Sequence, residues 1–584
     1  MLGFVSGEAI TLAMLALLLP ILRVDLVVRF GFASSGVSVR EVREALVVKA
    51  LKDIPLLAKL ADLIETRIEP DVITGGMQFD VHSFVTRYIV YAFVLTCLFV
   101  PLALILSVLV SPTLLALFLI PVTVLITPSL KAKNSVSERR MNIRDELPFF
   151  TLLASIMQSS GLSLYNAFLA VVGRGMLPAT EMEARIVQKG VGFGNNAVDS
   201  LDALAAVHPD DTFKHFLYGY TSILRSGGDL VLYLNGREKE FLGAMRFRWQ
   251  KYSETVGTIG EGLISIFVLL PLLLVVGSVT MPPELVAALS YAGVAALPMI
   301  ALVAYFVVKM VQPKTYDRLS GNARLGAIGL CAALVLTLPS REPWIIIGIS
   351  GAVGAALYGL PVRSQLREVR MIEGALPNFL REVSEYRKIG YDIRKAVLKI
   401  AEESRFNQVF DSLLGRVAAQ MRMGARLGDV QVPMRSWLGR VTFFTLDQIM
   451  ESGGGTPVNI EDLYGFISSY NELRREATSS INLYKFLGYA VPVAIPFVVT
   501  VLLGIVGSFG SATSALLGGS VTSIAIVNEA AALVTVVAAG AIAFTMTRAT
   551  DFTAKSTVNM AILLSLAVVS VSLTQYLPSI SLGF

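Results

Sequence analysis

Residues 144–168 read RDELPFFTLLASIMQSSGLSLYNAF, and residues 373–397 read EGALPNFLREVSEYRKIGYDIRKAV. Both stretches contain a Leu-Pro pair, a glycine 13 residues after the proline and an alanine six residues after the glycine. Farther on, LRSGGDL at 224–230 corresponds to MESGGGT at 450–456. The shared positions are Pro148, Gly161, Ala167, Gly227 and Gly228 in the first segment and Pro377, Gly390, Ala396, Gly453 and Gly454 in the second. The sequence therefore predicts one module that occurs twice.

The shared residues also predict the local structure of the module. Proline suits the first turn of a helix, so we expect Pro148 and Pro377 to start helices. Gly161 and Gly390 are expected to end those helices and to turn the chain. Strand patterns are weak throughout, so each module is expected to be a small α-helical bundle.

Composition places the modules in a membrane protein. Of 584 residues, 54% are hydrophobic and 16% are charged, against roughly 25% charged residues in soluble domains. Nine apolar runs approach the length needed to cross a bilayer. They are residues 88–110, 113–128, 259–281, 286–308, 326–338, 343–361, 486–509, 521–546 and 558–580. The expected fold class is an all-α polytopic membrane protein with about nine transmembrane helices and two homologous cytoplasmic helical bundles.

Positive charge predicts the orientation of these spans. Alternate segments between the runs hold 48 of the 49 Lys and Arg residues, and Arg341 is the exception. Cytoplasmic segments collect Lys and Arg, so we expect a cytoplasmic N-terminus and an outside C-terminus in the cell membrane. The expected organisation is a cytoplasmic helical region (1–87), a transmembrane hairpin (88–128), the first cytoplasmic module (129–258), a transmembrane pair (259–308), a cytoplasmic loop (309–325), a second transmembrane pair (326–361), the second module (362–485) and three transmembrane helices (486–580). Residues 1–22 are expected either to form an interfacial or core helix or to form a tenth span.

The two modules differ in charge. Residues 148–173 contain no charged residue, and the aligned residues 377–402 contain ten. We therefore expect the first hairpin to be covered on more than one face, by the other module, lipid headgroups or a second subunit. Charged substitutions at Ser155 or Ser159 should then be more harmful than changes at Ser384 or Lys388.

The sequence contains no pattern that predicts catalysis. A glycine-rich nucleotide-binding loop and the common hydrolase and metal motifs are missing, and two cysteines exclude a disulfide framework. His208 and His215 with Asp210 and Asp211 resemble a metal site, but a capped helix start explains them better. No catalytic, cofactor-binding or metal residue is predicted, and no cofactor. Glu529 is an acid inside a predicted span, where it either has a function or makes an internal hydrogen bond.

The proline, glycine and alanine spacing, with the later SGG and a membrane helix pair, resembles the type II secretion F domain. Two such domains in one chain resemble the archaeal branch of the inner-membrane platform proteins of type IV pili and archaella. The resemblance implies a non-enzymatic scaffold that couples a hexameric cytoplasmic secretion ATPase to the insertion of pilin or archaellin subunits. It also implies a homodimer.

Basic residues follow the membrane exits before both modules. These candidate contacts to the ATPase or to lipid headgroups are Lys131, Lys133, Arg139, Arg140 and Arg144, and then Arg363, Arg367 and Arg370. The modules are not strongly basic overall, with 15 Lys and Arg against 13 acids in 129–258 and 18 against 15 in 362–485, so we expect no nucleic acid partner. The alternative function is a polytopic transporter or channel with two regulatory cytoplasmic domains.

Overall fold

The computed structural model describes residues 55–76, 81–109, 119–280, 283–340, 342–429, 434–453, 456–517 and 522–576. The regular structure in these ranges is helical throughout, and the expected all-α membrane fold is confirmed. The chain forms two compact units, which are described separately. Unit 1 comprises residues up to Arg144 together with Asn195–Thr221, and unit 2 comprises Asp145–Gly194 and Ser222–Phe584.

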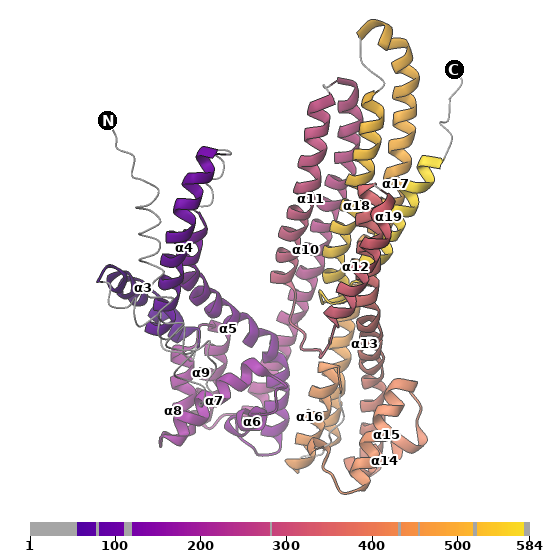
Figure 1. Cartoon of the computed structure of the whole chain (residues 1–584). Helices are drawn as coiled ribbons and strands as arrows, with labels where there is room; N and C mark the ends of the chain where they lie inside the picture. Colours follow the sequence, from indigo (N-terminus) through magenta and orange to yellow (C-terminus); the bar gives the residue numbers. More distant parts are fainter. Residues whose placement is uncertain are drawn as a thin grey trace, which may run out of the picture. The chain divides into compact units, whose positions relative to one another are not determined.

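Unit 1 is built around a helical hairpin. Helices α3 (Pro55–Thr74) and α4 (Val81–Leu109) pack together, as Figure 1 shows in indigo. The unit also contains the start of α5 (Leu119–Ser159), all of α8 (Ala197–Val207) and α9 (Asp211–Ser226) as far as Thr221. Its buried apolar core is Ala61, Ile68, Val72, Val85, Ile89 and Ala132. The prediction for residues 1–22 lies outside the described residues.

Unit 2 contains a bundle of long apolar helices, drawn lengthwise beside one another in Figure 1. They are α10 (Leu230–Thr280), α11 (Pro283–Val311), α12 (Ala323–Thr337), α13 (Pro343–Lys388), α17 (Pro457–Leu517), α18 (Thr522–Asp551) and α19 (Val558–Tyr576). Helix α18 contacts α10, α11, α17, α19 and α13, and α12 packs on α13. The bundle core is apolar, with Phe267, Leu297 and Val534 at most 1% exposed.

Seven helices of the described chain are long and apolar enough to cross a membrane. The last seven predicted spans fall in these helices as far as the described residues extend. The first predicted span lies in α4, and the second begins in residues that the structure does not describe, so the total of nine stays a prediction. The protein is a multi-pass membrane protein.

The membrane helices continue into the modules without interruption. Helix α10 has 51 residues, α13 has 46 and α17 has 61. At 1.5 Å per residue, α10 is about 75 Å long and exceeds the roughly 30 Å hydrocarbon core. The expected domain boundaries near residues 258, 361 and 485 therefore fall inside unbroken helices.

Shorter helices complete unit 2. They are α6 (Leu164–Val171), α7 (Pro178–Gly192), α14 (Ile393–Glu403), α15 (Gln408–Arg422), α16 (Trp437–Glu451) and the 3₁₀ turns η2 (Leu338–Ser340) and η3 (Leu427–Asp429). Helices α14 and α15 pack on the C-terminal part of α13 (Figure 1).

Candidate functional site

The first shared glycine of each segment ends its helix in a left-handed turn. The φ angle is +86° at Gly161 and +97° at Gly390. In both turns the glycine N–H donates three residues back and the next N–H donates five residues back, the pattern of a Schellman motif. A side chain would be strained at such φ values, so the turn requires glycine. The shared alanines, Ala167 and Ala396, are both fully buried in the helix that follows.

The SGG patterns also lie at helix ends. The φ angle is +71° at Gly227 and +68° at Gly453, and the Gly228 N–H donates five residues back to close α9. Gly454 lies outside the described residues. The Asp229 carboxylate accepts the N–H three residues on at 2.9 Å and caps α10. This part of the motif connects two helices.

The shared prolines do not start helices, so that prediction was wrong. Pro148 lies inside α5 and Pro377 lies inside α13. A proline in a helix leaves the carbonyl four residues earlier without its usual donor. In α13 this carbonyl belongs to Glu373, and it accepts the Asn471 side-chain amide at 2.8 Å. A polar group on α17 therefore allows α13 to continue through Pro377.

Residues 149–277 match the family model described as type II secretion system (T2SS), protein F. The chain carries a T2SS protein F domain. The match begins directly after Pro148 and ends within α10, so this F domain includes Gly161, Ala167, Gly227 and Gly228. Comparisons with curated proteins and with solved structures found no match to the chain.

An aromatic cluster joins the first helix of the F domain to the second segment. The Phe149 ring lies 4.7 Å from Trp437, 5.0 Å from Phe466 and 5.2 Å from Tyr470, measured between ring centroids in edge-on arrangements. The Trp437 indole N–H donates to the Met176 carbonyl of the F domain at 2.7 Å. Each edge-on pair adds about 1 kcal/mol to the burial of its surface.

Hydrogen bonds extend this contact along the uncharged hairpin of the F domain. Ser155 is 5% exposed and donates to Asn235 of α10, and the exposed Ser159 donates to Asn459 of α17 at 3.0 Å. The second segment therefore covers this hairpin, as one of the sequence alternatives proposed. Of the two comparison positions, Lys388 is exposed, but Ser384 is 3% exposed. Lys388 is the suitable control for substitutions in the hairpin.

The loop between α11 and α12 holds several parts of unit 2 together. We call residues 312–322 the junction loop. Its Lys314 N–H donates to Asp145 of α5 at 3.3 Å, and its Tyr316 carbonyl accepts from Arg440 of α16 at 2.7 Å. Further bonds join it to Gln365, Arg435, Trp437, Phe552 and Lys555. The sequence analysis expected only a connecting loop here, because a polar segment without periodicity does not indicate its partners.

Two acids of α5, Asp145 and Glu146, face this junction. Glu146 accepts the backbone N–H groups of Ala179 and Thr180 at 3.0 and 2.7 Å, and the Thr180 hydroxyl at 3.0 Å. Burial of the Glu146 carboxylate raises its pKa to about 7. These hydrogen bonds, and a further one from the Tyr316 side chain, lower the pKa but do not outweigh the burial. Burial also raises the pKa of Asp145, although the Arg248 guanidinium pairs with it.

A buried charge cluster lies beside the junction loop. Arg474 of α17 pairs with Glu373 of α13 at 2.7 Å and lies 4.0 Å from Asp317 of the loop. Glu373 also accepts from the Ser436 hydroxyl at 3.3 Å, and Asp317 accepts the Trp437 N–H at 2.7 Å. One guanidinium thus neutralises two acids with side chains 8% exposed, and links three elements.

The first set of predicted basic contacts divides into internal and exposed residues. Arg139 is 6% exposed and donates to the last carbonyl of α3 at 2.7 Å. Arg140 and Arg144 are exposed but also make internal contacts. Arg140 donates to the carbonyl of the proline before α9 at 3.1 Å, and Arg144 pairs with the aspartate that caps α9. Lys131 bonds to the Tyr88 hydroxyl and is exposed, and Lys133 is also exposed.

The second basic set lines a hollow. Arg363, Arg367 and Arg370 are exposed on α13, and the same hollow is lined by Lys485 of α17. Arg370 pairs with Asp551 at the end of α18 at 2.7 Å. The sequence analysis grouped the three arginines but missed Lys485, which is separated from them by more than one hundred residues.

The histidine-containing sequence before α9 forms a helix cap, as expected. The Asp210 carboxylate accepts the Phe213 N–H at 2.9 Å, and Asp211 is the first helical residue. Pro209 stands before the cap rather than within the first turn. The His208 ring accepts the Asp210 N–H at 3.0 Å, and His215 is exposed.

Two further groups have candidate roles. Asp62, Glu65 and His82 of unit 1 have ligand atoms within 4.8 Å of one another, a set that the sequence analysis missed. His82 Nδ1 already lies 2.7 Å from Glu65, which accounts for this pair as an ion pair or hydrogen bond. Glu529 lies on α18 with its side chain exposed.

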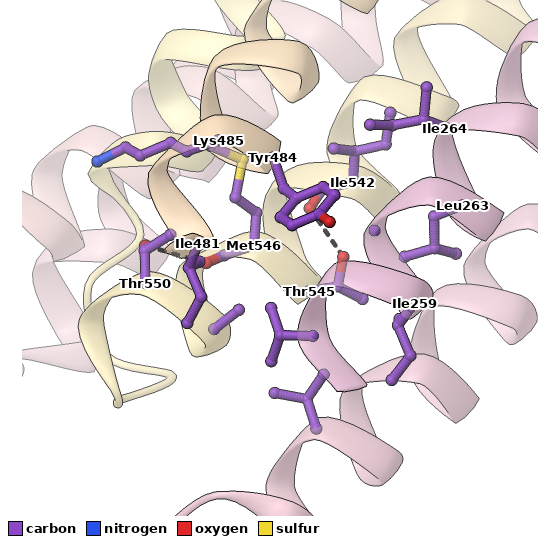
Figure 2. A pocket seen from close by; sticks show the side chains of 14 residues that line it. Ile259, Leu263, Ile264, Ile481, Tyr484, Lys485, Ile542, Thr545, Met546 and Thr550 are labelled. Atoms are coloured by element: carbon purple, nitrogen blue, oxygen red, sulfur yellow. Dashed lines mark hydrogen bonds between the residues drawn. The ribbon is translucent and has the colours of Figure 1, made fainter. Parts of the chain in front are cut away.

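An apolar hollow lies among α10, α17 and α18. Figure 2 shows Leu263, Ile264, Tyr484 and Met546 among the residues that line it. A Cβ at Gly257 would lie 2.8 Å from the Tyr484 ring, so glycine permits this close packing. At about 40 Å³ the space suits a packing gap rather than a ligand. In Figure 2 the Lys485 amine extends away from Leu263 and Ile264.

Proposed function

We propose that the protein is a non-enzymatic inner-membrane platform for the assembly of a type IV pilus-like filament or an archaellum. The observation that carries this proposal is the F domain at residues 149–277, which continues into a membrane helix without a break. The second segment, with the same glycine turn at Gly390 and the same buried Ala396, is proposed to be a second F domain.

The platform is proposed to couple a cytoplasmic hexameric secretion ATPase to the insertion of pilin or archaellin subunits. Continuous helices support this proposal, because a displacement at the polar end of α10, α13 or α17 is carried along a single rigid element. The proposed orientation has the N-terminus and both modules in the cytoplasm and the C-terminus outside. The exposed residues Lys131, Lys133, Arg140 and Arg144 are candidates for the ATPase contact.

Purification of the full-length protein from its own membranes tests the ATPase partner. We expect a hexameric ATPase to co-purify and to be identified by mass spectrometry. Lys133→Glu combined with Arg140→Glu should reduce its recovery, because the change reverses two exposed positive charges. The matched control is Lys395→Glu, an exposed lysine on α14.

Two results would argue against the platform. One is the absence of any ATPase from the purified complex together with solute flux in liposomes, which would support the transporter or channel alternative. The other is normal filament assembly in cells that lack the protein.

A further inference from the structure

A polar hollow of about 460 Å³ lies at the end of the membrane bundle where its apolar runs stop. Helices α13 and α17 and the turn between α18 and α19 form its walls. Its lining residues are Leu360, Arg363, Ser364, Leu366, Arg367, Arg370, Lys485, Asp551, Ser556, Val558 and Asn559. It is distinct from the apolar hollow of Figure 2, and Lys485 contributes to both.

The charges in this hollow are unbalanced. Its lining contains four basic side chains and one carboxylate, Asp551. Asp551 is engaged by Arg370 at 2.7 Å and by the Ser556 hydroxyl at 2.6 Å. No carboxylate oxygen of the described residues lies within 4.0 Å of the other three cations, Arg363, Arg367 and Lys485. The hollow therefore presents three positive charges that no carboxylate of the described chain pairs with directly, and Asp551 is the one acid in its lining.

The N-terminus of α19 adds backbone N–H donors that also carry positive charge. Helix α19 begins at Val558, and both Val558 and Asn559 line the hollow. The first N–H groups of a helix have no partner within it and carry a partial positive charge. Gly359 allows this close arrangement, since a Cβ there would lie 2.7 Å from the Val558 nitrogen.

The position of the hollow along the bundle indicates the kind of ligand. The apolar run of α13 ends at residue 361, that of α17 begins at 486 and that of α19 begins at 558. The hollow therefore lies at the level of lipid headgroups. Leu360 lines it and is 55% exposed, on the side of the apolar run. A ligand with a phosphate group and an acyl chain satisfies both features, whereas a protein surface would satisfy only the charge.

We propose that this hollow binds the phosphate group of an anionic membrane phospholipid through Arg363, Arg367 and Lys485. Arginine donates to phosphate oxygens in a forked geometry, and lysine adds a point charge. The acyl chains would extend along the apolar face beside Leu360. The site would fix the end of α13 relative to α17 and α19 at the membrane surface. The proposal goes beyond the platform function and does not depend on the ATPase.

Native mass spectrometry of the detergent-purified full-length protein tests the site. The probes are phosphatidylglycerol, phosphatidylcholine and inorganic phosphate, each titrated separately. We expect phosphatidylglycerol to bind at least about tenfold more tightly to the wild-type protein than to the Arg363→Gln/Arg367→Gln variant. Lys395→Gln removes one exposed positive charge away from the hollow and should bind the lipid like the wild type.

Further measurements distinguish lipid phosphate from inorganic phosphate, and loss of the site from misfolding of the variant. Lys485→Gln should weaken phosphatidylglycerol binding in the same direction, and all variants should retain the wild-type gel-filtration profile. Equal phosphatidylglycerol binding by the wild type and a folded double variant would overturn the proposal. Tighter binding of inorganic phosphate than of the lipid would overturn its assignment to a membrane phospholipid.

Discussion

Arg474 illustrates how single residues hold this protein together. It neutralises Glu373 and Asp317 on two other elements, and its side chain is 14% exposed. Arg474→Met should lower the free energy of unfolding by about 3–5 kcal/mol, because it leaves two buried acids without a counter-charge. Arg475→Met, at the exposed neighbouring position, is the control and should change stability by less than about 1 kcal/mol. Unfolding in mixed micelles measures both, and equal losses would contradict the role of the cluster.

Glu146 should make the stability of the folded protein depend on pH. Its folded-state pKa of about 7 lies above the ordinary value of 4.5. The stabilising contribution of its protonated form is therefore complete below pH 4.5 and is lost as the pH rises through about 7. Relative to Glu146→Gln, the wild type should lose about 3 kcal/mol of unfolding free energy between pH 4.5 and pH 8. A difference between the two proteins that does not change with pH would contradict this prediction.

At the scale of elements, the uncharged hairpin of the F domain depends on its cover. Ser155→Asp places a charge beside Asn235 of α10 at a position that is 5% exposed, so it should destabilise the folded protein by about 2 kcal/mol or more. Lys388→Asp at the equivalent exposed end of α13 loses only surface ion pairs and should cost less than about 1 kcal/mol. Thermal unfolding of the two variants compares them directly, and equal tolerance would remove the proposed role of the cover.

The membrane topology belongs to the whole molecule. In a variant without Cys97 and Cys331, single cysteines can be placed at Ser340 and Ser412, both exposed. A membrane-impermeant maleimide should label position 340 in intact cells, and position 412 only after the membrane is opened. This follows from the distribution of Lys and Arg, which predicts the α12–α13 loop outside and α15 inside. The reverse labelling pattern would invert the proposed orientation and with it the side on which an ATPase can act.

The residues explain why some features could be predicted and others could not. Gly161 and Gly390 were identified because their left-handed turns admit little else, so the repeated spacing has a local cause. The helical class and the last seven spans followed from apolar length. The contacts of Tyr316 could not be predicted, because its carbonyl bonds to a residue 124 positions away. Likewise, Pro148 and Pro377 have the sequence of helix starts, and for Pro377 a tertiary hydrogen bond from Asn471 allows the helix to continue.

The cover of the F-domain hairpin has a consequence for biosynthesis. Ser159 and its partner Asn459 are separated by 300 residues, which a ribosome adds in roughly 15 to 60 s at about 5–20 residues per second. During that interval the uncharged hairpin has been synthesised but its cover has not. A nascent chain in this state exposes Phe149 and its apolar neighbours next to the membrane. The order of translation therefore creates a period in which the hairpin depends on a chaperone or on the bilayer surface for protection from aggregation.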